Sequence, residues 1–117
     1  MKIKTSELID VALDWAVAKC GGKNGVLHDD GITRCVVIAA PSGVYKGTWR
    51  PSLNWAQGGP IVEREHIAVW WDGVWHSKYD GCRPDQVQDA LTPLIAAMRC
   101  YVASKLGDEI DIPKELT

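Results

Sequence analysis

Hydrophobic residues recur every three or four positions near the start of the chain, which is the pattern of a helix with one buried face. Thr5 or Ser6 precedes this stretch as a candidate N-cap, and Gly21 and Gly22 follow it as a stop signal. We therefore expect a first helix over about residues 6–20. Its apolar positions are Leu8, Ile9, Ala12, Leu13, Trp15, Ala16 and Cys20.

A second helical pattern covers "TPLIAAMRCYVASKLG", and its ends carry clear punctuation. Thr92 is placed as N-cap, Pro93 occupies the first helical position and Gly107 follows the last one. We expect this helix over about residues 93–106. Arg99 and Lys105 are its only charges, and a helix that is apolar nearly all round is covered on more than one side. Its strip of Ala96, Cys100 and Ala103 therefore predicts a subunit contact in a homo-oligomer.

The middle of the chain has the alternation and the β-branched residues of strands. "TRCVVIAA" (33–40) predicts a buried strand, "GVYKGTW" (43–49) predicts a weaker one, and the glycines of residues 21–31 predict a loop. If residues 61–71 are extended, Glu63 and Glu65 project from the face opposite His66 and form no acid/base pair with it. The acidic tail over residues 107–117 is expected to be irregular.

"EHIAVWWDGVWHSKY" predicts a hairpin, because Asp72-Gly73 is a favoured pair for a two-residue turn. That turn sets the register: Trp71 opposite Val74, Trp70 opposite Trp75, Ala68 opposite Ser77 and His66 opposite Tyr79. Trp70, Trp75, His66 and Tyr79 would then share one aromatic face. With central strands and a loop over residues 33–79, the fold class predicted is α+β, a small mostly antiparallel sheet packed with two helices in a single compact domain.

Length and charge limit the function classes. The 117 residues are the length of one domain, and 13 Lys and Arg against 15 Asp and Glu give a net charge of −2. No basic field attracts duplex nucleic acid. Glu7, Asp10 and Asp14 interrupt the first apolar stretch, so we expect neither a signal peptide nor a membrane partner. The four cysteines form no Cys-x-x-Cys pair and are expected to be thiols in a cytoplasmic protein.

Catalytic motifs are missing from the sequence. It has no phosphate loop, dinucleotide fingerprint, nucleophile elbow or zinc-protease motif. His28, Asp29 and Asp30 could in principle ligate a metal, but a solvated polar loop explains them better because no other cluster points there. The expectation is a protein that is not an enzyme and that has no cofactor and no metal.

Residues 50–64 carry the best binding chemistry. In "NWAQGG", Trp55 offers a stacking surface, Asn54 and Gln57 offer amides for a base edge, and Gly58 and Gly59 permit close backbone approach. Arg50 and Arg64 could supply charge to an anion. Alternatively, Trp55 plugs the edge of the core while Gly-Gly-Pro forms a tight turn. Both interpretations remain open at this point.

Arg99 presents a similar choice, because a guanidinium on an apolar helix must find a partner or reach water. A ligand phosphate would satisfy it, and so would Asp10 or Asp14 on the first helix.

"KTSELIDVALDWAVAKC", "WAQGGPIVERE" and "TPLIAAMRCYVASKLGDEIDIP" together resemble the NinX-like family of small tailed-phage and prophage proteins. The resemblance implies a phage-encoded accessory protein in the host bacterial cytoplasm. It places two sets of residues in the family's central loop and second helix: Ser52, Asn54, Trp55, Gln57, Gly58, Gly59 and Pro60; and Thr92, Pro93, Arg99 and Tyr101.

Several unrelated families of small phage proteins capture nucleotide messengers of bacterial defence, and this chain is similar to them in its general traits. The leading hypothesis is therefore a non-enzymatic protein that sequesters a nucleotide-type immune signal, either ADP-ribose-derived or a cyclic nucleotide. Its ligand-binding residues would be Ser52, Asn54, Trp55, Gln57, Gly58, Gly59, Arg99, Arg50 and Arg64. The alternatives are a protein-interaction module without a small ligand and, less favoured, a nucleotide hydrolase.

Overall fold

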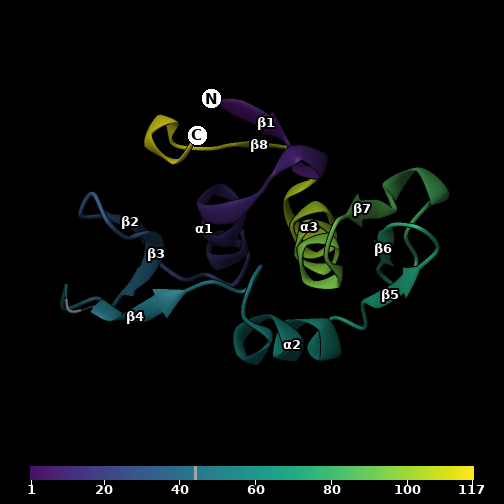
Figure 1. Cartoon of the computed structure of the whole chain (residues 1–117), viewed down its shortest axis with the longest axis horizontal. Helices are drawn as coiled ribbons and strands as arrows, with labels where there is room; N and C mark the ends of the chain where they lie inside the picture. Colours follow the sequence, from purple (N-terminus) through teal and green to yellow (C-terminus); the bar gives the residue numbers. More distant parts are fainter. Residues whose placement is uncertain (44) are drawn as a thin grey trace.

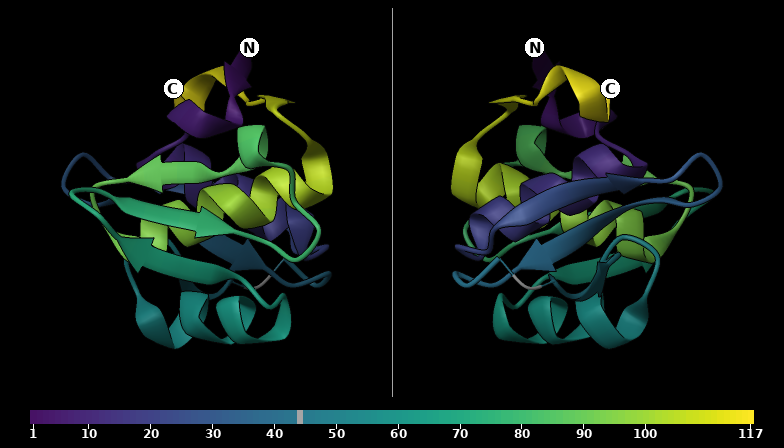
Figure 2. Two further views of the ribbon diagram at one scale, coloured as in Figure 1. Left: turned by 90° about the vertical axis from the view of Figure 1, so that its right-hand side faces the viewer. Right: turned by 90° about the vertical axis from the view of Figure 1, so that its left-hand side faces the viewer.

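Two small sheets enclose a central pair of helices in the computed structural model, which describes residues 1–43 and 45–117. Helices α1 (Asp10–Cys20) and α3 (Pro93–Leu106) pack on each other in the middle of the molecule (Figure 1). One sheet covers α1 and the other covers α3 (Figure 2). The first sheet has the order β2-β3-β4 (Gly25–Asp29, Arg34–Ala39, Tyr45–Trp49), and the second has the order β5-β6-β7 (Ala68–Trp71, Trp75–Lys78, Gln88–Ala90).

The remaining elements close the two ends of this assembly (Figure 1). Helix α2 (Trp55–Arg64) connects the two sheets and packs against α3. At the opposite end, β1 (Lys2–Lys4) pairs with β8 (Glu109–Asp111). All strand pairs in the described residues are antiparallel, which confirms the predicted α+β class. Short 3-10 turns cover Thr5–Glu7, Pro84–Gln86 and Lys114–Leu116.

The first helix starts later than predicted, and neither Thr5 nor Ser6 caps it. Ile9 is the N-cap, with an extended φ of −150°, and no side chain caps the helix there. The Thr5 hydroxyl instead donates to the carbonyl oxygen of Gly107 at 2.7 Å, and Thr5 is fully buried. A residue with cap chemistry is thus used to tie the start of the chain to the end of α3.

The predicted strand over residues 33–40 is confirmed as β3, and the weaker one as β4, although Val44 within it lies outside the described residues. The expected loop over residues 21–31 is wrong in part, because Gly25–Asp29 forms β2. Close packing explains why a glycine, Gly25, begins this strand. A Cβ there would lie 3.1 Å from Val36 and 3.2 Å from Ala18, so the small residue lets α1 and β3 pack closely around β2.

Residues 55–64 form helix α2, so the loop expected around Gly58-Gly59 is wrong, and residues 61–64 are helical and not extended. Asn54 is the N-cap, and its Oδ1 accepts from the amide of Ala56 at 2.8 Å. The buried positions Gly58 and Ile61 are one helical turn apart and face α3. Tertiary packing therefore overrides two glycines and an internal proline, which are residues of low helix propensity.

The hairpin over residues 68–78 is confirmed, but its predicted register is wrong by one residue. Trp71 pairs with Trp75 and Trp70 pairs with His76, so the turn contains three residues, Asp72 to Val74. Gly73 supplies the positive φ of 107° that this turn needs. Trp70 and Trp75 therefore lie on opposite faces of the sheet, and the predicted common aromatic face does not form.

Helix α3 has the predicted boundaries. The Thr92 hydroxyl oxygen accepts from the amide of Ile95 at 3.1 Å, and Gly107 follows the helix with a φ of 89°. The predicted intersubunit strip is wrong for Ala96 and Cys100, which are fully buried within one chain, whereas Ala103 is half-buried. The homo-oligomer stays a prediction. The tail is not irregular either, since Glu109–Asp111 forms β8.

None of the helices in the described residues has the length and apolar character needed to cross a bilayer.

Candidate ligand-binding site

A cavity of about 410 Å³ opens where the C-terminal end of α1 meets β4, α2 and α3. This volume is within the range of roughly 300–1,000 Å³ typical of small-molecule sites. Lys23 and Arg64 supply positive charge, Trp49 and Tyr101 supply aromatic surface, and Gln57 supplies an amide. Val17, Gly21, Ala56, Pro60 and Ile61 complete the lining.

One wall pairs Lys23 with Trp49. The Lys23 ammonium lies 5.3 Å from the centroid of the Trp49 ring, which is a cation–π distance. The Trp49 Nε1 is buried and has no hydrogen-bond partner among the described residues. An indole N–H only donates, and a buried donor without an acceptor is costly.

The facing elements α2 and α3 pair Arg64 with Tyr101 in a similar way. The Arg64 guanidinium lies 5.9 Å from the Tyr101 ring centroid and donates to the Tyr101 hydroxyl at 3.4 Å. It also forms an ion pair with Glu65 at 2.9 Å. That hydrogen bond raises the pKa of Arg64, so the group stays cationic. Burial raises the pKa of the Tyr101 hydroxyl, which keeps it a neutral donor at physiological pH.

Gln57 holds this site in shape. Its Oε1 accepts from the amide of Arg50 at 2.6 Å, and its Nε2 donates to the carbonyl oxygen of Thr48 at 2.8 Å. The two bonds clamp the backbone on either side of Trp49. Gln57, predicted as a base-reading amide, therefore lies at the cavity but uses both ends of its amide within the protein.

Gly58 and Trp55 occupy positions that sequence reasoning did not foresee. A Cβ on Gly58 would lie 2.4 Å from the Pro51 carbonyl oxygen and 2.6 Å from Leu94, so the close approach at Gly58 is made by the chain itself. The Trp55 side chain is 53% exposed, which makes the core-plug interpretation wrong. Gly59 lies beside the Trp55 ring, at 3.7 Å from a Cβ built on it.

Ser52 and Arg50 belong to a different cavity region near the start of α1. Ser52 is buried, and its amide donates to the Asp14 carboxylate at 2.9 Å. Arg50 lines a cavity together with Asp10 and Asp14. The structure therefore brings Gln57 and Arg64 together at one site and places Arg50 at another.

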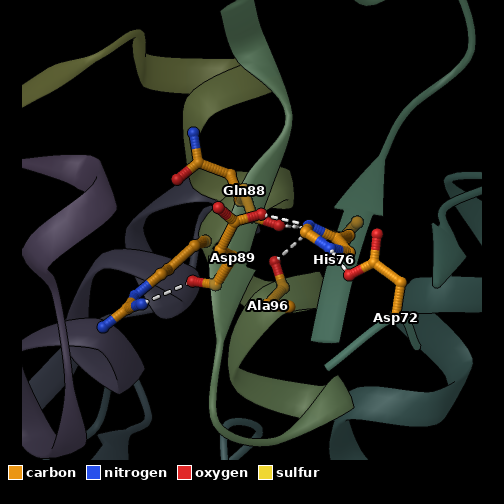
Figure 3. A network of polar contacts seen from close by, with 7 residues as sticks. Asp72, His76, Gln88, Asp89 and Ala96 are labelled. Carbon is orange, nitrogen blue, oxygen red and sulfur yellow. Dashed lines mark hydrogen bonds and ion pairs between the residues drawn. The ribbon is translucent and has the colours of Figure 1, made fainter. Parts of the chain in front are cut away.

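Arg99 lines neither of these two cavities and donates hydrogen bonds to backbone oxygens. Its Nε donates to the Leu8 carbonyl at 2.8 Å. Its NH1 donates at 2.7 Å to the carbonyl of Asp89, a residue labelled in Figure 3. The prediction of Asp10 or Asp14 as its partner is wrong. Arg99 thus joins the start of α1 to β7, and burial lowers its pKa.

Figure 3 also shows the His76 ring between the carboxylates of Asp72 and Asp89, one bonded to each ring nitrogen. Trp70 stacks on the same ring at 5.3 Å between centroids. No group of three or more His, Cys, Asp or Glu side chains in the described part of the chain is arranged to hold a metal ion. His76 therefore acts as a cross-link within the sheet.

The sequence was compared with models of known protein families. The family described as "Bacteriophage P22, NinX" matches residues 4–105, which include every lining residue of the cavity. The chain belongs to the NinX family. No curated protein matches it. The family resemblance drawn from the three sequence segments is thereby confirmed, and the chain is a NinX-family phage protein.

Sequence reasoning missed Lys23 and Trp49 as residues of the NinX-family cavity. Lys23 follows the glycine pair after α1, and Trp49 ends a short strand, so neither has a neighbour that signals binding. Tyr101 was noted only through the family resemblance. A sequence pattern reports on residues that are near one another along the chain. It therefore cannot predict a contact between a cation and an aromatic ring that lie more than 20 residues apart, as Lys23 and Trp49 do.

Proposed function

We propose that this NinX-family protein binds an anionic, aromatic ligand of the nucleotide type in the cavity between α1, β4, α2 and α3. The observation that carries the proposal is the convergence of Lys23 and Arg64 with the rings of Trp49 and Tyr101. Cations suit a phosphate, and ring faces suit a base.

The same lining supports a binding role without catalysis. Among the described lining residues there is no Asp, Glu, His, Cys, Ser or Thr side chain to act as nucleophile or general base. Tyr101 is the one titratable hydroxyl, and burial raises its pKa, which weakens it as a base. This lining favours capture of a ligand over its conversion.

For a phage protein acting in the bacterial cytoplasm, capture of a host nucleotide messenger is a function that binding alone can perform. The candidates are ADP-ribose-derived and cyclic nucleotides made during anti-phage defence. Sequestration removes the messenger in proportion to the amount of protein made, so affinity and expression set the effect.

The first test identifies the ligand. Protein purified from phage-infected cells is denatured by heat, and the released small molecules are analysed by mass spectrometry and then titrated calorimetrically. Linear and cyclic ADP-ribose and cyclic nucleotides are titrated in parallel. If none of these binds and no small molecule is released, the proposal is wrong.

Two lysine variants test the site itself. Lys23 and Lys78 each lie over a tryptophan ring, at 5.3 Å from Trp49 and 5.9 Å from Trp70, but only Lys23 lines the cavity. A charge-assisted hydrogen bond contributes about 1.5–3 kcal/mol, so Lys23→Gln should weaken binding about ten- to a hundredfold. Lys78→Gln should leave it unchanged. Equal losses in both variants would contradict this site.

A protein-interaction role remains the second candidate because of one exposed apolar region. Leu91 is 88% exposed and Trp71 is 60% exposed, and Ile9 and Val74 also reach the surface. Ile9, Val74 and Leu91 line a cavity of about 260 Å³ together with Ala90 and Ile95, and Asp89 and Arg99 complete its lining. Such a surface fits another protein or a second copy of this chain. Light scattering of the wild type and Leu91→Glu would detect self-association through this region.

A further inference from the structure

A second cavity, of about 280 Å³, lies beside the N-terminal half of α1 and carries charges of both signs. It shares no lining residue with the cavity proposed to bind nucleotides. Its charged groups are two carboxylates from α1 and two guanidinium groups from β3 and the β4–α2 connection: Asp10, Asp14, Arg34 and Arg50. Val11, Cys35 and Leu53 form its apolar walls.

Asp14 is the unusual member of this set. The residue is only 2% exposed, yet it is one of the residues that line the cavity. Its Oδ1 accepts one hydrogen bond from the Ser52 amide at 2.9 Å, and the buried Ser52 hydroxyl beside it makes no hydrogen bond of normal geometry. Burial raises the pKa of Asp14 to about 6, so the carboxylate form lacks the contacts that would fully compensate its desolvation.

Arg50 provides the opposite charge without an ion-pair partner within 4.0 Å in the described part of the chain. Its backbone is fixed by the bond from its amide to Gln57. Arg34 differs, because it donates to the Glu115 carbonyl at 2.7 Å and lies 3.7 Å from Asp29. Arg50 is thus the guanidinium available to a ligand.

We propose that this cavity binds a small zwitterion, an α-amino acid, with its ammonium group on Asp14 and Asp10 and its carboxylate on Arg50. Two carboxylates and two guanidinium groups sum to no net charge. A purely anionic ligand would face Asp10 and Asp14, and a purely cationic one would face Arg34 and Arg50. A zwitterion meets an opposite charge at each end, and its side chain can lie on Val11 and Leu53.

Size supports the same ligand class. The cavity is close to the lower end of the roughly 300–1,000 Å³ range of small-molecule sites, which suits an amino acid better than a nucleotide. Placing an ammonium on Asp14 also compensates a buried charge that the protein leaves only partly paired. Binding would therefore lower the electrostatic free energy of the Asp14 carboxylate as well as that of the ligand's ammonium group.

The ligand test uses calorimetry and thermal unfolding of the full chain with each proteinogenic amino acid. We expect at least one to bind with a Kd of about 1 mM or tighter. Its N-acetyl form, which lacks the ammonium, and its carboxamide form, which lacks the carboxylate, should each bind at least about tenfold more weakly, since each loses one charge-assisted contact. Absence of binding by every amino acid, or blocked forms that bind as tightly as the free amino acid, would overturn the proposal.

Two variants test the assigned residues. Asp14→Asn keeps the oxygen that accepts from Ser52 but loses the charge, and Arg50→Gln loses the guanidinium; each should weaken binding roughly tenfold or more. Arg83→Gln is the control, because Arg83 is exposed and paired with Asp85 away from this cavity. Wild-type affinity should also rise between about pH 5 and pH 7 as Asp14 loses its proton, with no such rise in Asp14→Asn. Unchanged affinity in Arg50→Gln would overturn the assignment even if Asp14→Asn failed to fold.

Discussion

Gly58 shows how a single missing side chain sets the position of a helix. A Cβ at this position would lie 2.4 Å from a backbone oxygen of Pro51 and 2.6 Å from Leu94. Backbone cannot rotate aside as a flexible side chain can. We expect Gly58→Ala to lower the free energy of unfolding by about 1–3 kcal/mol, the usual cost of overpacking, measured by urea denaturation.

Gly59 is the matched control for this prediction. A Cβ on Gly59 would meet only the Trp55 ring, at an ordinary 3.7 Å. The gain in helix propensity from alanine, about 1 kcal/mol, is opposed by the restriction that Pro60 places on a preceding residue with a Cβ. Gly59→Ala should therefore stay within about 1 kcal/mol of the wild type. Equal destabilisation by both variants would contradict the assignment of the Gly58→Ala loss to the close contact with Pro51.

Asp14 gives a pH-dependent prediction at the same scale. Burial raises its pKa from 3.8 to about 6 in the folded protein. The folded state thus binds the proton more tightly than the unfolded state, so the stability contribution is complete below about pH 4 and is lost as pH rises to about 6. Asp14→Asn removes this loss and should be more stable than the wild type by roughly 1–3 kcal/mol at neutral pH, since each pKa unit is about 1.4 kcal/mol. Thermal unfolding at about pH 4 and pH 7 checks the difference, which should vanish at the lower pH.

At the scale of elements, local signals predicted some structures well and others poorly. Thr92, Pro93 and Gly107 mark the ends of α3 by chemistry that acts within one turn, so its bounds were predicted correctly. Helix α2 has a good N-cap in Asn54, but Gly58, Gly59 and Pro60 argue locally against a helix. Its formation depends on packing against α3, which no local pattern contains.

The hairpin was predicted with a register that is wrong by one residue, and this small error changes which side chains share a face. Asp72-Gly73 marks a turn correctly, but it does not determine whether the turn has two residues or three. The third residue, Val74, shifts the pairing by one and sends Trp70 and Trp75 to opposite faces. His76 then lies opposite Trp70 and between two carboxylates, a network that the predicted register would not bring together.

This network predicts a second pH dependence in the β5-β6-β7 sheet. Hydrogen bonds to Asp72 and then Asp89 raise the pKa of His76 above its ordinary value of 6.5. The stabilising contribution is complete below that ordinary value and is lost as pH rises through the raised pKa. The Asp14→Asn variant lacks the pH dependence that Asp14 causes, so it isolates the effect of His76. The free energy of unfolding of this variant should still fall as pH rises above about 6.5. NMR titration of His76 should report a lower pKa in Asp72→Asn and no change in the control Asp85→Asn.

At the scale of the whole molecule, the cavity proposed to bind nucleotides depends on four segments that are distant in sequence. Lys23 follows α1, Trp49 ends β4, and Arg64 and Tyr101 come from α2 and α3. Sequence alone suggested Gln57 and Arg64 from a single motif, and the structure places both at the cavity. The other members become neighbours only when the sheets close around the central helices, which is why they were not predicted.

The central helices also protect two of the four thiols. Cys35 and Cys100 are buried, and burial raises the pKa of Cys100 to about 12. Cys20 and Cys82 are partly exposed, but burial also raises the pKa of Cys20, to about 11. Because the thiolate is the reactive form, a thiol reagent at neutral pH should modify Cys82 first. Mass spectrometry of peptides should find Cys100 modified only after denaturation, and early modification of Cys100 would contradict this packing.

The pairing of β1 with β8 places the two ends of the chain next to each other. The amino group of Met1 donates to Asp111 at 2.7 Å and to the Ile112 carbonyl at 3.1 Å. A short flexible linker could therefore join the ends into a closed ring without disturbing the sheets, and the backbone could be reopened at the exposed tip near Gly31 and Ile32. Cyclisation restricts the unfolded chain, for which loop entropy allows a gain of up to about 4 kcal/mol. The permuted chain, opened at that tip, would carry fusion partners on the side of the β2–β3 turn instead of beside β1 and β8.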